Sequence, residues 1–200
     1  MRRPELKLTA AVLLFFCLKS QAQAFKFPVT NNDLRANLSK VITDYVDGFS
    51  ALKGDTISVS SQSIEFATKL NFPGSDHNTI TQYKSKNQIY SWEAELLSSD
   101  DFEEASKKYK WLYNQLKVMT VKVQDYSFTL SGNYDAPDES KGFSTSIFKL
   151  TPNAANVPRL KIKASMEYEF PEWKVKLFVY EREREDTEQG DIYSDWSFSS

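Results

Sequence analysis

The chain has 200 residues, with 25 Lys and Arg against 27 Asp and Glu, one His and one Cys. Hydrophobic residues make up 40% and charged residues 26%, proportions typical of a globular protein rather than of a disordered or collagen-like chain. This composition excludes a disulfide scaffold, a cysteine-based zinc cluster and a strongly basic nucleic-acid-binding protein.

Residues 1–24 have the pattern of a cleavable export signal. Three basic residues precede an almost unbroken apolar run over residues 8–18, and Ala22 and Ala24 supply the small residues that a signal peptidase requires. The apolar run is shorter than the roughly 18 residues needed to cross a bilayer. Two alternatives stay open, a retained membrane anchor and a lipoprotein attached through Cys17.

Cleavage after Ala24 would change the charge and remove the thiol. Four basic residues and one acidic residue would be lost, so the formal charge would move from −2 to −5, and the only cysteine would go with them. We therefore expect an exported protein, periplasmic or extracellular, whose mature chain lacks cysteine. Residues 25–200 are predicted to form a single α+β domain, with residues 186–200 as a polar and aromatic C-terminal tail.

Two segments place apolar residues three and four positions apart, the spacing that lines one face of a helix. The first helix is predicted within residues 31–49, with Asn31 or Asn32 as its cap and Gly48 or Gly54 at its end. The apolar stripe of this helix consists of Leu34, Leu38, Val41, Tyr45 and Phe49.

The second helix has the stronger signals at its start. Residues 99–101 offer Ser and Asp caps, and Glu103 and Glu104 in the first turn complement the helix dipole. The apolar stripe of this helix consists of Phe102, Ala105, Tyr109, Leu112 and Leu116.

Elsewhere apolar residues alternate with polar ones, which is typical of antiparallel strands with one buried face. Turn-forming residues separate the strands at residues 71–78 and 133–141. The sequence predicts an α+β fold in which an antiparallel sheet of about six strands carries two helices on one face, in the order α-β-β-(β)-α-β-β-β-β. The predicted strands are residues 64–72, 90–96, 126–130, 143–150, 160–170 and 173–179.

The last two strands are predicted to pair through a loop at Pro171 and Glu172. Because side chains alternate between the two faces, one register matches apolar residues on one face and opposite charges on the other. The predicted apolar pairs are Phe170 with Trp173, Tyr168 with Val175 and Met166 with Leu177, and the charged pairs are Glu169 with Lys174 and Glu167 with Lys176.

Residues that carry catalysis are scarce. His77 is the only histidine and lies in a predicted turn, and the glycine-rich loops that bind phosphate are missing. Residues 135–139 are acidic but lack the spacing of an EF-hand, and most other acids lie in runs typical of helix starts and solvated faces. We assign no catalytic residue, no metal ligand and no cofactor.

A few aromatic residues fall outside the predicted core positions. Trp111 lies off the apolar stripe of its helix, Phe178 and Tyr180 lie on the outward face of the last strand, and Trp196 lies in the polar tail. Exposed apolar residues that form one patch indicate an interface, so these four are the candidate binding residues. The alternative is that the tail folds back over Phe178 and buries several of them.

The chain resembles small exported proteins of unknown function of the Bacteroidetes type. The resemblance rests on the signal segment, the early helix, a Ser- and Asp-capped second helix over residues 101–109, and late alternating strands such as residues 173–177. It implies the same layered fold and carries no active-site residues with it.

These observations favour an exported, non-catalytic binding or accessory protein. Its partner would be a protein, peptide or lipid-like ligand, with no nucleic acid and no membrane span after cleavage of the signal. Two other functions stay open: a carboxylate-dependent hydrolase acting on glycans, and a chaperone-like protein that holds exported clients.

Overall fold

The computed structural model describes residues 31–84, 89–123, 125–152 and 159–181, and the predicted export signal and Trp196 lie outside these ranges. Within them the fold is α+β, as predicted, with two helices and one antiparallel sheet. The elements are α1 (Asn31–Tyr45), β1 (Lys53–Val59), β2 (Ser63–Thr68), β3 (His77–Tyr83), β4 (Tyr90–Ser99), α2 (Phe102–Leu116), β5 (Thr120–Val123), β6 (Tyr126–Gly132), β7 (Phe143–Thr151), β8 (Leu160–Glu169) and β9 (Glu172–Glu181).

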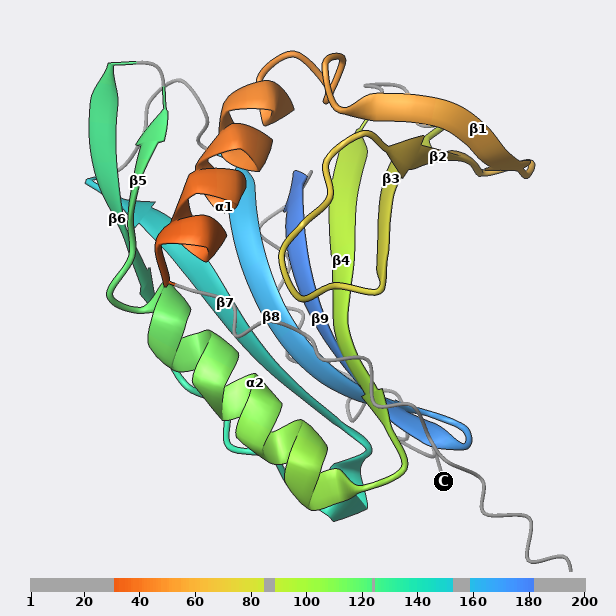
Figure 1. Cartoon of the computed structure of the whole chain (residues 1–200), viewed down its shortest axis with the longest axis vertical. Helices are drawn as coiled ribbons and strands as arrows, with labels where there is room; N and C mark the ends of the chain where they lie inside the picture. Colours follow the sequence, from red (N-terminus) through yellow and green to blue (C-terminus); the bar gives the residue numbers. More distant parts are fainter. Residues whose placement is uncertain (1–30, 85–88, 124, 153–158, 182–200) are drawn as a thin grey trace, which may run out of the picture.

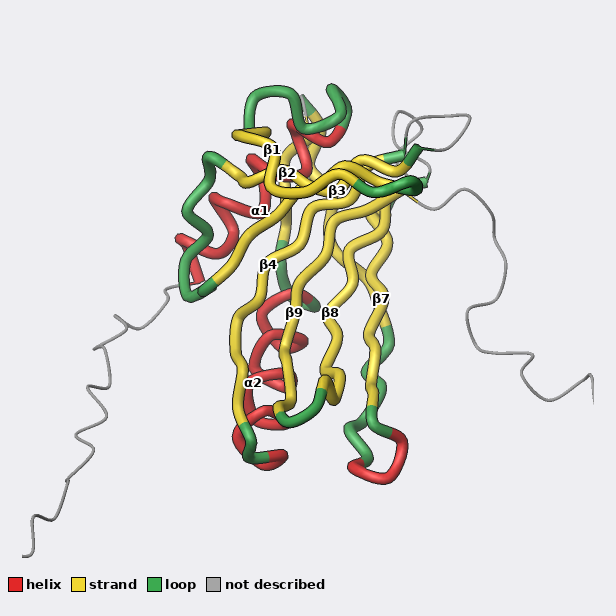
Figure 2. Tube along the Cα trace, turned by 90° about the vertical axis from the view of Figure 1, so that its right-hand side faces the viewer, coloured by secondary structure: helices red, strands yellow, loops and turns green. Residues whose placement is uncertain are grey.

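The sheet consists of two meanders joined at their last strands. Its strand order is β1-β2-β3-β4-β9-β8-β7-β6-β5, so β4 pairs with β9 at the centre. Both helices lie on the same face of this curved sheet (Figure 1), and the strands β4 and β9 pass in front of α2 in the side view (Figure 2). The prediction that both helices cover one face is therefore confirmed.

The apolar stripes of the two helices form the core with the inward-facing strand residues. Leu34, Leu38 and Val41 of α1 are fully or almost fully buried. The α2 stripe is buried at Ala105, Tyr109, Leu112 and Leu116, as predicted. From β9, the inward-facing residues are Trp173, Val175, Leu177 and Val179.

The start of α2 follows the predicted capping pattern. The Asp101 carboxylate accepts hydrogen bonds from the backbone N–H of Glu103 at 2.8 Å and of Glu104 at 3.3 Å. These bonds satisfy two of the N–H groups that the first turn of a helix leaves without a partner.

Replacing Asp101 with alanine is expected to lower the free energy of unfolding by about 1 kcal/mol, the usual contribution of an N-cap. Chemical denaturation of the variant measures this loss. The neighbouring Asp100 is exposed and is not the cap, so Asp100→Ala is the matched control. Equal losses in the two variants would contradict the role given to Asp101.

The turn after α1 is held by a carboxylate. Gly48 and Phe49 both adopt positive φ, at 62° and 57°, and this left-handed backbone ends the helix just after Tyr45. The Asp44 carboxylate accepts hydrogen bonds from the backbone N–H of Ala51 at 3.2 Å and of Leu52 at 2.9 Å. As a result the buried Phe49 ring packs in the core, although its residue lies beyond the helix.

The predicted count of about six strands is wrong, because the described residues form nine. The strands that the prediction lacked are β1, β3 and β5, whose sequences are KGDTISV, HNTITQY and TVKV. These are short, rich in Thr and polar residues, or at a sheet edge, so they show little apolar alternation. Conversely, the predicted strand over residues 64–72 ends at Thr68, and Phe72 reaches the core from a loop.

The predicted register of the last hairpin is wrong by two residues. The two-residue turn is Phe170 and Pro171, so Tyr168 pairs with Trp173 and Met166 pairs with Val175. Phe170 therefore leaves the predicted core position and is 88% exposed, whereas Trp173 is buried. A shift by two residues keeps every side chain on its face, which is why the alternation alone did not reveal the error.

Candidate binding surface

The face of the sheet opposite the helices is the candidate binding surface. Along β9, Lys174, Lys176, Phe178 and Tyr180 alternate with buried core residues and are partly exposed. In the described part of the chain, both helices contact the sheet from the other side. This outward face divides into a charged half and an aromatic half.

The charged half is a network of ion pairs across three strands. Lys174 Nζ lies 3.0 Å from Glu95 Oε2 of β4, and Lys176 Nζ lies 3.4 Å from Glu93 Oε1 of the same strand. Both lysines also contact the Glu169 carboxylate at the end of β8. The acids at this end of the face are thus engaged by lysine side chains.

The pKa values in this network follow from these contacts. The hydrogen bond from Lys176 lowers the pKa of Glu169, and the hydrogen bond to Glu95 raises the pKa of Lys174. Burial raises the pKa of Glu93, and the nearby Lys176 opposes that rise. In this half of the face, three carboxylates thus share two lysine ammonium groups.

The aromatic half combines two rings of β9 with two lysines of β8, of which Lys163 also lies 3.9 Å from the Glu167 carboxylate. In the register of β8 and β9, Lys161 faces Tyr180 and Lys163 faces Phe178, and Lys163 Nζ lies 4.2 Å from the centre of the Phe178 ring. On β7, Ile147 pairs with Lys163. We call this group the sheet-face patch; it consists of Ile147, Lys149, Lys161, Lys163, Phe178 and Tyr180.

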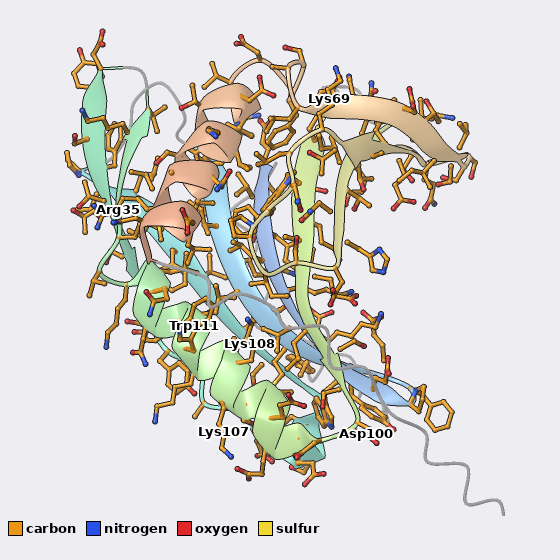
Figure 3. All side chains as sticks on the ribbon, in the orientation of Figure 1. Arg35, Lys69, Asp100, Lys107, Lys108 and Trp111 are labelled. Atoms are coloured by element: carbon orange, nitrogen blue, oxygen red, sulfur yellow. The ribbon has the colours of Figure 1, made fainter. Side chains whose placement is uncertain are left out.

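The structure brings together two of the four predicted binding residues. Phe178 and Tyr180 lie two positions apart on the outward face of β9. Trp111 lies on α2, on the helix side of the sheet, where Lys108 Nζ lies 4.6 Å from its ring centre (Figure 3). Trp111 therefore does not belong to the same surface, and Trp196 lies outside the described residues.

Ile147 and Lys149 are members of the patch that sequence reasoning missed. Their strand, β7, was predicted, and its alternation places them on the outward face beside β8. The sequence did not reveal that β7 lies beside β8, because the order of strands in a sheet depends on the tertiary structure.

A second exposed aromatic feature lies at the turn between β8 and β9. The Trp173 ring is buried and lies 5.0 Å from the Tyr168 ring, which in turn lies 6.5 Å from the Phe170 ring. Acidic residues flank the turn at Glu169 and Glu172. This row of rings runs from the core to solvent and is separate from the sheet-face patch.

The residues considered for catalysis and for metal binding are an exposed histidine and carboxylates that accept hydrogen bonds from backbone N–H groups. His77 is exposed at the start of β3 rather than in a turn. The Asp135 carboxylate accepts a hydrogen bond from the backbone N–H of Thr145 at 2.9 Å, and the Asp138 carboxylate caps a 3-10 turn. Within the described ranges, no group of three His, Cys, Asp or Glu side chains is placed to hold a metal ion.

The fold and this surface define an α+β protein with an antiparallel sheet that is covered by helices on one face. Comparisons of the chain with protein-family models, with curated proteins and with solved structures found no match. The resemblance to small exported proteins of the Bacteroidetes type thus stays a prediction. None of the helices among the described residues has the length and apolarity needed to cross a membrane.

Proposed function

We propose that the chain is an exported, non-catalytic binding protein whose sheet-face patch binds an acidic peptide segment that contains aromatic residues. The observation that carries the proposal is the pairing of Lys161 with Tyr180 and of Lys163 with Phe178 on the face opposite the helices. Lysine ammonium groups attract carboxylates, and the rings of Phe178 and Tyr180 offer flat apolar surface to other rings.

The arrangement of the acids also supports binding over glycan hydrolysis. A glycosidase uses two carboxyl groups across a cleft, one of which acts as a proton donor. Here Glu93, Glu95 and Glu169 lie side by side on the strands of the outward face, and lysines engage all three. The hydrogen bond from Lys176 lowers the pKa of Glu169 and favours its charged form, which makes it a poor proton donor, whereas burial raises the pKa of Glu93.

A library of random peptides displayed on phage tests the proposal. The immobilised protein is expected to enrich peptides that combine Asp or Glu with Trp, Tyr or Phe. The double variant Lys161→Glu/Lys163→Glu is expected to lose at least ten-fold of that enrichment, because it reverses the charge of the patch.

The matched control is Lys107→Glu/Lys110→Glu, which changes the charge equally on exposed residues of α2. This control is expected to enrich the same peptides as the unmodified protein. If the unmodified protein enriches no such peptides, or if both double variants lose them equally, the sheet-face patch is not the binding site. Circular dichroism of both variants checks that the fold is kept.

A further inference from the structure

The sheet-face patch lies beside the point where the chain leaves the sheet. β9 ends at Glu181, one residue after Tyr180 of the patch. Residues 182–200 follow this strand in the sequence and lie outside the described ranges. Residues 182–200 are therefore covalently attached to the protein next to the candidate binding surface, and we call them the tether.

The composition of this tether complements the patch. Residues 185–198 contain five acidic residues and no Lys or Arg. The acids precede or alternate with apolar and aromatic residues, in the order Asp191, Ile192, Tyr193, Ser194, Asp195, Trp196, Ser197, Phe198. The sheet-face patch therefore offers lysines and aromatic rings, and residues 185–198 contain acids and aromatic rings.

The tether is long enough for Asp191 and the residues after it to reach the sheet-face patch. Nine residues lie between Glu181 and Asp191, and they reach up to about 30 Å when extended. The patch needs less, because Phe178 and Tyr180 are about 7 Å apart along β9 and neighbouring strands are about 4.8 Å apart. A tether of this kind holds its end at an effective concentration of order millimolar, so individually weak ion pairs and ring contacts suffice.

We propose that residues 185–198 are an intramolecular ligand that occupies the sheet-face patch and competes there with the external peptide. The competition with an external peptide rests on the proposed function, whereas the binding of residues 185–198 to the patch does not. In this bound arrangement, Asp191 and Asp195 pair with lysines of the patch, and Trp196 or Tyr193 packs on Phe178 and Tyr180.

Limited proteolysis by chymotrypsin tests the occupancy directly. Cleavage after Tyr193 and Trp196, followed by mass spectrometry, is expected to be slow in the unmodified protein. In Lys161→Glu/Lys163→Glu the cleavage is expected to be at least ten-fold faster, because the reversed charges repel the tether. The control Lys107→Glu/Lys110→Glu is expected to keep the slow rate.

Reversing the charges of both the tether and the patch shows whether the two pair directly or whether each substitution simply changes the cleavage rate. Asp191→Lys/Asp195→Lys alone is expected to speed cleavage, and its combination with Lys161→Glu/Lys163→Glu is expected to restore slow cleavage. Synthetic peptides of residues 185–200 with and without the Lys substitutions correct for the preference of the protease. Equal corrected rates in all variants, or no restoration in the combined variant, would overturn the proposal.

A second measurement distinguishes this inference from the proposed function. A peptide selected from the phage library is expected to bind Asp191→Lys/Asp195→Lys at least ten-fold more tightly than the unmodified protein, because competition is removed. If proteolysis shows a protected tether but the library yields no peptide, the patch serves only the chain itself and the proposed function fails. If peptides bind equally to both proteins and the tether is unprotected, only the intramolecular ligand is ruled out.

Discussion

Replacing Trp92 with alanine is expected to lower the free energy of unfolding by about 4 kcal/mol, within the range for deleting a fully buried large aromatic side chain. Trp92 is the largest fully buried side chain of the described residues, and its ring lies 4.9 Å from that of the buried Phe72. Among these residues its indole N–H has no hydrogen-bond partner, so the loss comes from packing and from the cavity that remains.

Urea denaturation followed by circular dichroism measures this loss. With a slope of about 2 kcal/mol per molar urea, the midpoint is expected to fall by about 2 M. Trp111→Ala is the matched control, because Trp111 is only partly buried where it packs against the core. Its cost is expected to be about 1 kcal/mol, and equal costs for the two tryptophans would contradict the assignment of Trp92 to the core.

Replacing Gly132 with alanine is expected to lower the free energy of unfolding by about 3 kcal/mol, the upper end of the range for forcing extra atoms into a packed site. A Cβ atom at this position would lie 2.4 Å from the backbone oxygen of Ile147 and 2.9 Å from the Phe148 ring. Gly132 is the last residue of β6 and pairs with Phe148 of β7, so relief of the clash requires the two strands to separate.

Gly142→Ala is the control for this prediction. At Gly142 a Cβ atom would meet nothing within 4 Å, although its φ of 71° makes a side chain unfavourable. That cost is expected to be about 1 kcal/mol, as for a single residue in the left-handed region. Thermal or urea denaturation compares the two, and a loss at Gly142 as large as that at Gly132 would contradict the steric argument.

The helices were predictable because each combines a local signal with a long pattern. In α2 the Asp101 cap begins the helix, and the apolar stripe from Ala105 to Leu116 repeats over about three turns. Both signals depend only on residues that are close in the sequence, so the helix could be predicted without knowledge of the tertiary structure.

The missing strands were hidden because each buries at most two side chains: none in β1, Ile80 in β3, and Val121 and Val123 in β5. β1 is an edge strand with a mostly exposed burial pattern, and its pairing with β2 contains two register shifts. β5, the other edge strand, has only four residues. Strands at sheet edges are stabilised by backbone hydrogen bonds to one neighbour, which leave little trace in the apolar pattern.

The sequence predicted the β9 residues of the candidate surface but not their neighbours on the other strands. Alternation along β9 correctly placed Phe178 and Tyr180 on the outward face, since the period of a strand is a local property. Their lysine neighbours follow from the pairing of β9 with β8, and Trp111 falls on the opposite side because α2 packs against the inward face. These relations join residues that are far apart in the sequence.

The sequence by itself determined the two helices, their buried stripes and the face on which each residue of the longer strands lies. It determined these because helix and strand periods act over a few residues. Only the tertiary structure decided the number of strands, the register of the last hairpin and the position of Phe170 in the turn of that hairpin. Those features depend on which strand lies beside which, and a shift by two residues leaves the local alternation unchanged.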